Sequence, residues 1–188
     1  MKKITLEDIK KLDPCTSGYE NLVKYYPDFN MTMVEFLELE HIPNNDKEWL
    51  IRKMVDGNIL KWWSLECAKS VAHIYNKKYP NDNMVNDCLK ANKDFLLGSI
   101  SLDELLIKRR AAYDAVGASD AYAADAAYSA YASSDAAYAS TSDAAYDAAY
   151  AASDAYATYS SDAAYAAKKE QWNINFMLLI CILEDEGE

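Results

Sequence analysis

Apolar residues recur at helical spacing along most of the first 110 residues. The clearest run lies between Ile59 and Tyr79, where apolar side chains follow at three- or four-residue intervals, at Leu60, Trp63, Cys67, Val71 and Tyr75. That interval places them on one face of an α-helix. No run shows the sustained alternation of a half-buried strand, so the pattern predicts an all-α fold.

Helix-start and helix-stop residues divide this part into short helices. Thr5 and Ser101 each begin a capping-box sequence, with an acidic residue three positions later. Thr32 precedes the apolar segment MVEFLEL and is expected to start another helix. Gly57 and Gly98 follow apolar runs, and glycine is the residue that most often ends a helix in the left-handed conformation.

The composition changes after residue 110 to Ala, Tyr, Asp and Ser. The sequence DAAY occurs five times, at Asp125, Asp135, Asp143, Asp147 and Asp162. The intervals of ten, eight, four and fifteen residues are each within about one residue of a multiple of the helical turn. Since Ala is the best helix former, the repeat predicts helices on which Asp and Tyr form neighbouring stripes separated by Ala.

The repeat is too long for one helix in a compact chain. Residues 111–167 would span about 85 Å as a single helix, against roughly 40 Å for a compact chain of 188 residues. Gly117 can end one helix and Ser119 can cap the next, and Ser140–Ser142 and Ser160–Ser161 are further candidate N-caps. We predict a helical bundle with Ala/Tyr-rich antiparallel helices in the C-terminal half. One long projecting helix or coiled coil is the alternative.

Length and composition favour one folded domain. With 188 residues and 51% hydrophobic residues, the chain can bury one core. We expect a single all-helical domain over residues 1–188, with a diverse part (1–110) and the repeat plus an apolar C-terminal helix (111–188). The apolar run Ile174–Leu183 is too short for a membrane span, and the charged N-terminal segment does not resemble a signal peptide. These features predict a cytoplasmic protein with no membrane partner.

The negative charge is concentrated in the repeat. The formal net charge is −11, and residues 111–167 contain eight Asp and no Lys, Arg or Glu, which leaves −3 for the remainder. Phosphate binding requires Lys and Arg, so direct nucleic-acid binding is not expected. An acidic surface instead favours a protein partner with a basic surface.

The sequence has few residues for catalysis or metal binding. The five glycines are isolated, which excludes a Gly-rich phosphate loop, and His41 and His73 are the only histidines. Cys67 and His73 are about 9 Å apart along one helix, so we read them as a core thiol and a solvent-side imidazole. The four cysteines, Cys15, Cys67, Cys88 and Cys181, are expected to be buried and reduced. We therefore predict no enzyme activity, no catalytic residue, no metal and no cofactor.

The DAAY stripes have three interpretations. Asp and Ser could solvate the outer faces of a bundle packed through Ala and Tyr; exposed Asp–Tyr pairs could form a contact surface; or converging Asp stripes could mimic a nucleic acid. The second gives the candidate partner-binding residues Asp125, Tyr128, Asp135, Tyr138, Asp143, Tyr146, Asp147, Tyr150 and Asp154. The Ala-rich faces also allow a homodimer, and Trp62 and Trp63 are read as core residues or, alternatively, as a ligand platform.

Several segments in a fixed order resemble a known group of proteins. They are WSLECAKSVAHIY (63–75), KYPND (78–82), CLKAN (88–92) and GSISLDEL (98–105), followed by the Ala-rich repeat. Over roughly residues 60–165 they resemble bacterial and phage Ala-repeat proteins that are similar to immunity proteins of bacterial toxin systems. Many of those relatives carry Arg in the repeat, where this chain carries Asp and Tyr. The resemblance implies an α-helical, non-enzymatic protein of a bacterial or phage conflict system, and it transfers no catalytic residue.

The leading hypothesis is therefore a binding protein that neutralises another protein, as an immunity factor or a phage-encoded inhibitor of host defence. Alternatives are a bundle that sequesters a small nucleotide-like or aromatic ligand, and an acidic nucleic-acid mimic.

Overall fold

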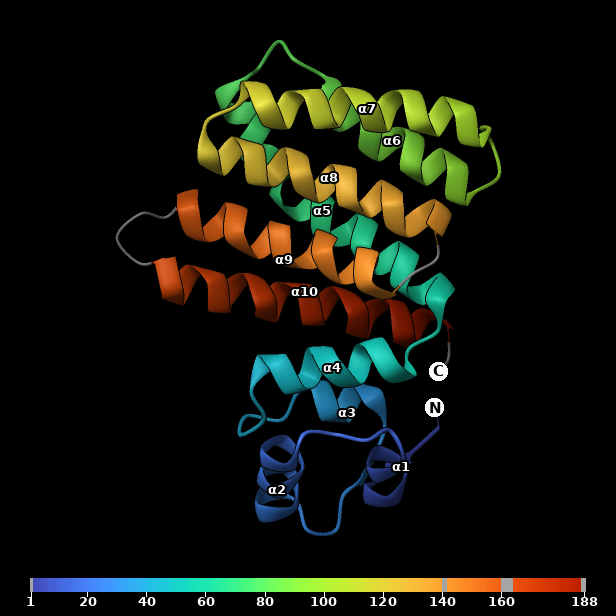
Figure 1. The fold of residues 1–188 in the computed structure, drawn as a ribbon, viewed down its shortest axis with the longest axis vertical. Helices are drawn as coiled ribbons and strands as arrows, with labels where there is room; N and C mark the ends of the chain where they lie inside the picture. The colour runs from blue at the N-terminus through green and yellow to red at the C-terminus, as the bar shows by residue number, and fades with distance from the viewer. Residues whose placement is uncertain (1, 140–141, 160–163, 187–188) are drawn as a thin grey trace. The chain divides into compact units, whose positions relative to one another are not determined.

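The computed structural model describes residues 2–139, 142–159 and 164–186, and these residues are almost entirely helical (Figure 1). The predicted all-α class is confirmed. The chain divides into two compact units, one of Met1–Val55 with Ile180–Glu188 and one of Asp56–Leu179. The change of composition after residue 110 falls inside the second unit. The expectation of a single domain stays a prediction.

In the first unit, residues 2–55 contain four short helices and two short strands, one ahead of the first helix and one between the second and the third. The helices are α1 (Leu6–Lys11), α2 (Thr16–Tyr25), α3 (Met33–Leu37) and α4 (Asn44–Met54). The strands β1 (Ile4–Thr5) and β2 (Asn30–Met31) pair in antiparallel register, with Ile4 opposite Met31. Thr5 and Thr32, at or just after the ends of these strands, form the capping boxes that start α1 and α3.

Apolar side chains from all four helices form the core of this unit. Ile9, Leu22, Phe36 and Leu50 are each at most 4% exposed. Near them, the ammonium of Lys47 donates to the carbonyl of Leu37 at 2.7 Å, which pairs a carbonyl at the C-terminal end of α3. Short elements thus depend on packing and caps, because helices of five to eleven residues are marginal alone.

The described part of the second unit is built from six helices in two layers: α5 (Gly57–Lys78), α6 (Met84–Leu96), α7 (Leu102–Ala118), α8 (Ala121–Ala139), α9 (Ser142–Tyr159) and α10 (Ala164–Glu186), the last of which belongs to it as far as Leu179. Helices α7 to α10 lie side by side and alternate in direction, with α5 and α6 behind them (Figure 1). The prediction that the repeat folds back into antiparallel helices is confirmed, and the single projecting helix is wrong.

Helix α5 lies against both α8 and α9. Its residue Trp63 is 1% exposed and donates from Nε1 to the carbonyl of Asn175 at 2.7 Å. Near its C-terminal end, Tyr75 Oη donates to Asp82 at 2.8 Å, and the other carboxylate oxygen of Asp82 accepts from the backbone of Met84 at the start of α6. These hydrogen bonds fix the α5–α6 turn.

One of the three glycines expected to end a helix does so, and the other two do not. Gly98 has φ +71° just after α6, as expected for a left-handed C-cap, and Ser101 with Glu104 forms the predicted capping box of α7. Gly57 instead begins α5, because Asp56 caps the new helix. Helix α7 continues past Gly117, and Ser119 caps its end by donating to the Ala115 carbonyl. The N-cap predictions at Ser140 and Ser160–Ser161 lie outside the described residues.

Small residues form the buried faces of α8 and α9. Their alanines are largely buried, among them Ala126, Ala127, Ala130, Ala148 and Ala152, all 0% exposed. Small side chains let helix axes approach closely. The same faces carry buried serines, at Ser129, Ser133, Ser134 and Ser153. The expectation that Ser faces water is therefore wrong for these four residues.

Buried polar groups are joined across the helices. Ser129 on α8 donates to the carbonyl of Ala148 on α9 at 2.7 Å. Asn92 on α6 donates to Ser133 at 3.0 Å, and Asn175 on α10 donates to the carbonyl of Ala149 at 3.0 Å. A buried hydroxyl or amide needs such a partner, so these bonds also specify which helices lie together.

The expectation for the cysteines is corrected in part. All four cysteines are free, but only Cys67 and Cys88 are buried, while Cys15 and Cys181 are exposed. The apolar run near the C-terminus is buried on one side, at Leu179 and Leu183, and exposed on the other, where Met177 is 64% exposed. Every helix in the described residues is too short or too polar to cross a lipid bilayer.

Candidate functional site

The candidate partner-binding residues lie opposite the buried faces of α8 and α9. All nine belong to the described residues, and each is exposed or half-buried, whereas most of the alanines and serines between them are buried. Because α8 and α9 pack against each other, the two stripes are neighbours. We call the nine residues together the Asp/Tyr surface.

The stripe on α8 follows helical spacing through Asp125, Tyr128, Asp135 and Tyr138. Tyr128 and Tyr138 are 38% and 40% exposed, large fractions for aromatic side chains. Tyr131 lies between them, with its ring centroid 5.7 Å from that of Tyr128, and was not predicted from the sequence. The three-residue spacing between Tyr128 and Tyr131 could have placed Tyr131 on the same helix face. Tyr131 was left out of the prediction because it does not belong to a DAAY unit.

The stripe on α9 combines exposed and half-buried members. Asp143 and Asp147 are exposed, and Tyr150 is 42% exposed. Tyr146 is half-buried, with its ring 6.2 Å from the buried indole of Trp172 on α10 and 5.8 Å from Tyr150. Tyr146 thus connects the surface to the interior, and Tyr150 and the two aspartates face solvent.

Arg109 on α7 lies at the centre of the α8 stripe. Its Nη2 atom is 2.6 Å from Oδ1 of Asp135, and its guanidinium carbon is 4.1 Å from the ring centroid of Tyr131 and 5.8 Å from that of Tyr138. Burial lowers the pKa of Arg109, but the hydrogen bond and charge of Asp135 outweigh burial and raise the pKa overall. Arg109 therefore stays charged and holds two tyrosine rings by cation–π contact.

Lys168 on α10 has the same role on the α9 stripe. Its ammonium is 2.5 Å from Oδ1 of Asp154 and 4.0 Å from the ring centroid of Tyr150. Burial lowers the pKa of Lys168, but hydrogen bonds with Asp154 and Tyr150 outweigh burial and raise it. Neither cation was predicted from the sequence, because Arg109 precedes the repeat and Lys168 follows it.

The two stripes influence each other electrostatically. The pKa of Tyr128 is raised by burial first and next by the charge of Asp147, which lies on the other helix. The pKa of Tyr138 is raised mainly by the charge of Asp135. Both hydroxyls stay protonated at neutral pH. The hydroxyl of Tyr138 hydrogen-bonds to Asp135, and that of Tyr128 can donate a hydrogen bond to a partner.

The charge of the repeat is partly compensated by basic side chains. At least four of its eight aspartates form ion pairs, namely Asp114 with Arg110, Asp120 with Lys78, Asp135 with Arg109 and Asp154 with Lys168. The Asp/Tyr surface and its two neighbouring cations thus mix rings, carboxylates and positive charge, with less negative charge than the sequence count suggests.

Other candidate sites from the sequence are not brought together. Burial raises the pKa of Cys67 well above its usual value, so the thiol is not a nucleophile at neutral pH, and His73 is exposed with Nδ1 2.9 Å from the Ser70 carbonyl. Trp63 is a core residue, as the first of its two interpretations predicted. Among the described residues, no group of three or more His, Cys, Asp or Glu side chains is placed to hold a metal ion.

A protein-family model matches more than half of the chain. No curated protein and no solved structure matches the chain. The protein-family model described as "Imm-5 like putative immunity protein" matches residues 53–177, which include α5 to α9, the first part of α10 and the whole Asp/Tyr surface. The match covers well over half of the 188 residues and agrees with the resemblance seen in the sequence. The chain belongs to the Imm-5-like immunity protein family.

Proposed function

We propose that this protein is a non-enzymatic binding protein of a bacterial or phage conflict system, which neutralises another protein through the Asp/Tyr surface. The observation that carries the proposal is the exposure of Tyr128, Tyr138 and Tyr150 on the solvent sides of two adjacent helices. Tyrosine is enriched in the cores of protein interfaces and in binding hot spots. Membership of an immunity protein family supports a protein as the partner.

The fixed positions of the rings support recognition. Arg109 lies against the rings of Tyr131 and Tyr138, and Lys168 lies over Tyr150. Side chains held in place before binding lose less conformational entropy when a partner docks. A rigid helical surface with ordered aromatic rings is therefore suited to tight binding.

The exposed carboxylates of α9 indicate the kind of partner. Asp143 and Asp147 are exposed on α9 beside Tyr150, and such carboxylates would speed encounter with a basic protein surface. The tyrosines would provide the area buried in the interface. The aspartates would orient the partner and raise the association rate. We place the encounter in the cytoplasm, where an immunity factor meets an incoming toxin and a phage inhibitor meets a host defence protein.

Nucleic-acid mimicry has less support. Duplex DNA carries a charge for about every 1.7 Å of axis, whereas one Asp per roughly seven residues gives a charge per ~10 Å of helix. Ion pairs with basic side chains reduce that density further, because they involve at least four of the eight aspartates of the repeat. The surface lacks the uniform negative charge that such a mimic needs.

Self-association through the alanine faces also has little support, because those alanines are already buried within one chain. The exposed tyrosines are the part of the surface that could still bind a second copy.

Enzyme activity would have to use residues other than Cys67, whose thiol is buried in the core.

A rescue screen tests the proposal. Genomic fragments of the native host or its phages are introduced into cells with and without this protein, and fragments tolerated only in its presence encode candidate partners. The screen is repeated with Tyr128→Ala, Asp147→Asn and Tyr150→Ala combined. A matched control combines Leu97→Ala, Leu102→Ala and Asp103→Asn, which also alters two exposed large side chains and one carboxylate, at the end of α6 and the start of α7 and not on α8 or α9.

We expect the surface variant to lose rescue and the control to keep it. If the surface variant still rescues the cells, the binding site lies elsewhere on the protein. The absence of any fragment that depends on this protein would argue against neutralisation itself.

A further inference from the structure

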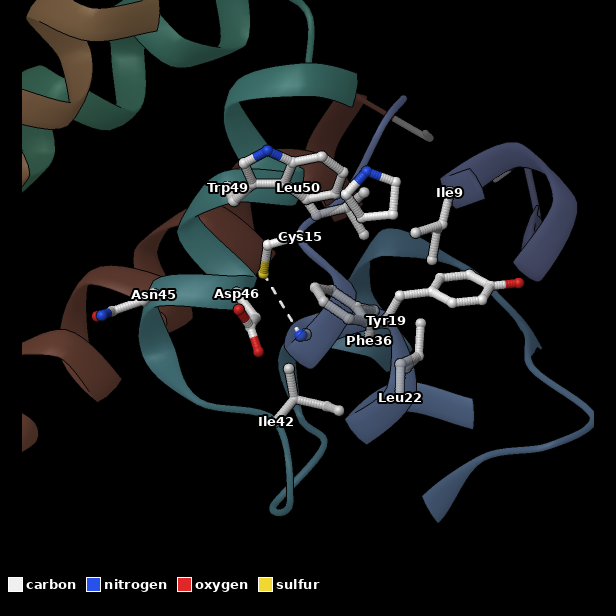
Figure 2. Close-up of a pocket in the computed structure, with 12 residues that line it drawn as sticks. Ile9, Cys15, Tyr19, Leu22, Phe36, Ile42, Asn45, Asp46, Trp49 and Leu50 are labelled. Carbon is white, nitrogen blue, oxygen red and sulfur yellow. Dashed lines mark hydrogen bonds between the residues drawn. The ribbon is translucent and has the colours of Figure 1, made fainter. Parts of the chain in front are cut away.

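The first unit contains a pocket that the proposed function does not use. It has a volume of about 240 Å³ and is formed by α1, α2, α4 and the segment around α3. Its walls are mainly core side chains, including Ile9, Leu22, Phe36 and Leu50 (Figure 2). All of its lining residues lie between Ile9 and Leu50, outside the residues that the family model matches.

One end of the pocket is polar. A Cβ atom added to Gly18 would lie 3.0 Å from Oδ1 of Asp46 and 3.1 Å from Sγ of Cys15, so the carboxylate and the thiol flank the same point of α2. Figure 2 shows the side chains of Cys15 and Asp46 close to each other. The backbone N–H of Gly18 donates to Cys15 Sγ at 3.4 Å. Glycine costs about 1 kcal/mol relative to alanine inside a helix. Here it leaves the space between the two side chains open.

Asp46 has no compensating partner in the part of the chain that the structure describes. No hydrogen bond or ion pair is found there for its side chain, and burial is the cause that raises its pKa. A partly buried carboxylate without a donor or a cation is unfavourable. A ligand that supplied a positive charge at this position would remove that cost.

We propose that this pocket binds a small organic amine, in which an apolar or aromatic group fills the apolar end and the protonated nitrogen pairs with Asp46. The volume suits such a molecule, because an apolar cavity of about 150 Å³ already holds benzene and the pocket adds room for a short aminoalkyl chain. Anionic ligands such as nucleotides fit poorly, since Asp46 is the only charged residue among the described side chains that line it.

Cys15 provides a reporter at the polar end. Cys67 and Cys88 are buried, so Cys181→Ser leaves Cys15 as the accessible thiol of the folded chain. Its sulfur can exchange with small disulfide probes, in which the thiolate attacks the probe disulfide and the other half leaves as a thiol. Three probes of equal length are used, each with a phenyl group and with an amine, a neutral amide or a carboxylate.

The experiment measures the fraction of full-length Cys181→Ser protein labelled by each probe at neutral pH, with 2-mercaptoethanol as competitor and intact mass as readout. We expect the amine probe to resist about tenfold more competitor than the carboxylate probe, because a partly buried ion pair strengthens binding by about tenfold. With Asp46→Asn the amine preference should disappear, while labelling by the amide probe stays the same.

Asp13→Asn is the matched control, because Asp13 is a carboxylate two residues from Cys15 that does not line the pocket. Its φ of +56° is one that Asn also adopts readily. The amine preference should survive this change. Equal labelling by the amine and carboxylate probes would overturn the proposal, as would an equal loss of preference in the Asp13 and Asp46 variants. No partner protein is needed, so the outcome is independent of the function proposed above.

Discussion

Arg109 on α7 and Asp135 on α8 form an ion pair, 2.6 Å between Nη2 and Oδ1, with both side chains only about one fifth exposed. The two residues are 26 positions apart in the sequence. Their pair lies among the tyrosines of the Asp/Tyr surface and connects α7 to the first repeat helix. It thus contributes both to the packing of the bundle and to the position of the rings.

Breaking this pair should destabilise the protein. Arg109→Met leaves Asp135 partly buried without its cation, and we expect the free energy of unfolding to fall by about 1–3 kcal/mol, between the values for exposed and fully buried pairs. A double-mutant cycle with Asp135→Asn, measured by urea unfolding, should give a coupling energy of about 1 kcal/mol or more. Additive effects of the two changes would show that the pair contributes nothing to stability.

The small residues of α8 should tolerate no enlargement on the buried side. Ala127→Leu inserts a branched side chain where Ala127 is 0% exposed, and overpacking of this kind costs about 1–3 kcal/mol or more. Ala139→Leu, at the exposed end of the same helix, should change stability by less than about 0.5 kcal/mol. Thermal unfolding of both variants checks the prediction, and similar melting temperatures would contradict the close packing of α8.

Stability should fall between about pH 10 and pH 12. Burial, and then the hydrogen bond to Asp82, raise the pKa of Tyr75 to about 12, so the folded state keeps this proton at pH values where the unfolded chain has lost it. The contribution is therefore complete below about pH 10 and is lost as the pH rises to about 12, by roughly 2–3 kcal/mol in total.

Tyr75→Phe is the control for this pH dependence. It should cost about 1 kcal/mol at neutral pH through the lost hydrogen bond, yet flatten the decrease above about pH 10. Urea midpoints at about pH 8, 10 and 11 measure both effects. An unchanged slope in the variant would assign the alkaline loss to other groups.

Asp46→Asn should stabilise the protein at neutral pH. Burial raises the pKa of Asp46, so the folded state holds this proton more tightly than the unfolded chain, and ionisation at higher pH costs stability. The variant should be more stable than the wild type at neutral pH, and the difference should vanish below the ordinary pKa of 3.8. A less stable variant at neutral pH would indicate a favourable partner for the carboxylate.

The sequence was sufficient for features set by local chemistry. The capping boxes at Thr5 and Ser101 start helices because the reciprocal bonds involve residues only three positions apart. Helix α2 was missed, since its N-cap is Cys15, whose thiol is an unusual capping group. Gly57 was misread because the same glycine can end one helix or begin the next, and Asp56 decides between them.

The features that depend on tertiary packing were not predictable from local patterns. The serines of the repeat were expected at the surface, but Ser129 pairs with a carbonyl on the neighbouring helix and is buried. Lys168 reaches Asp154 from another helix, and no sequence period relates the two. For the four DAAY units that the structure describes, beginning at Asp125, Asp135, Asp143 and Asp147, the periodicity did place the aspartates and tyrosines on common stripes, because helical spacing alone determines which residues share a face.

Binding through the Asp/Tyr surface is tested most directly by the affinity for a partner found in the rescue screen. Calorimetry compares the wild type, the combined Tyr128→Ala, Asp147→Asn and Tyr150→Ala variant, and the Leu97→Ala, Leu102→Ala and Asp103→Asn control. If the Asp/Tyr surface is the binding site, the surface variant should bind at least about thirtyfold more weakly, as expected for the loss of hot-spot tyrosines, and the control should bind like the wild type. Wild-type affinity in the surface variant would contradict binding through this surface.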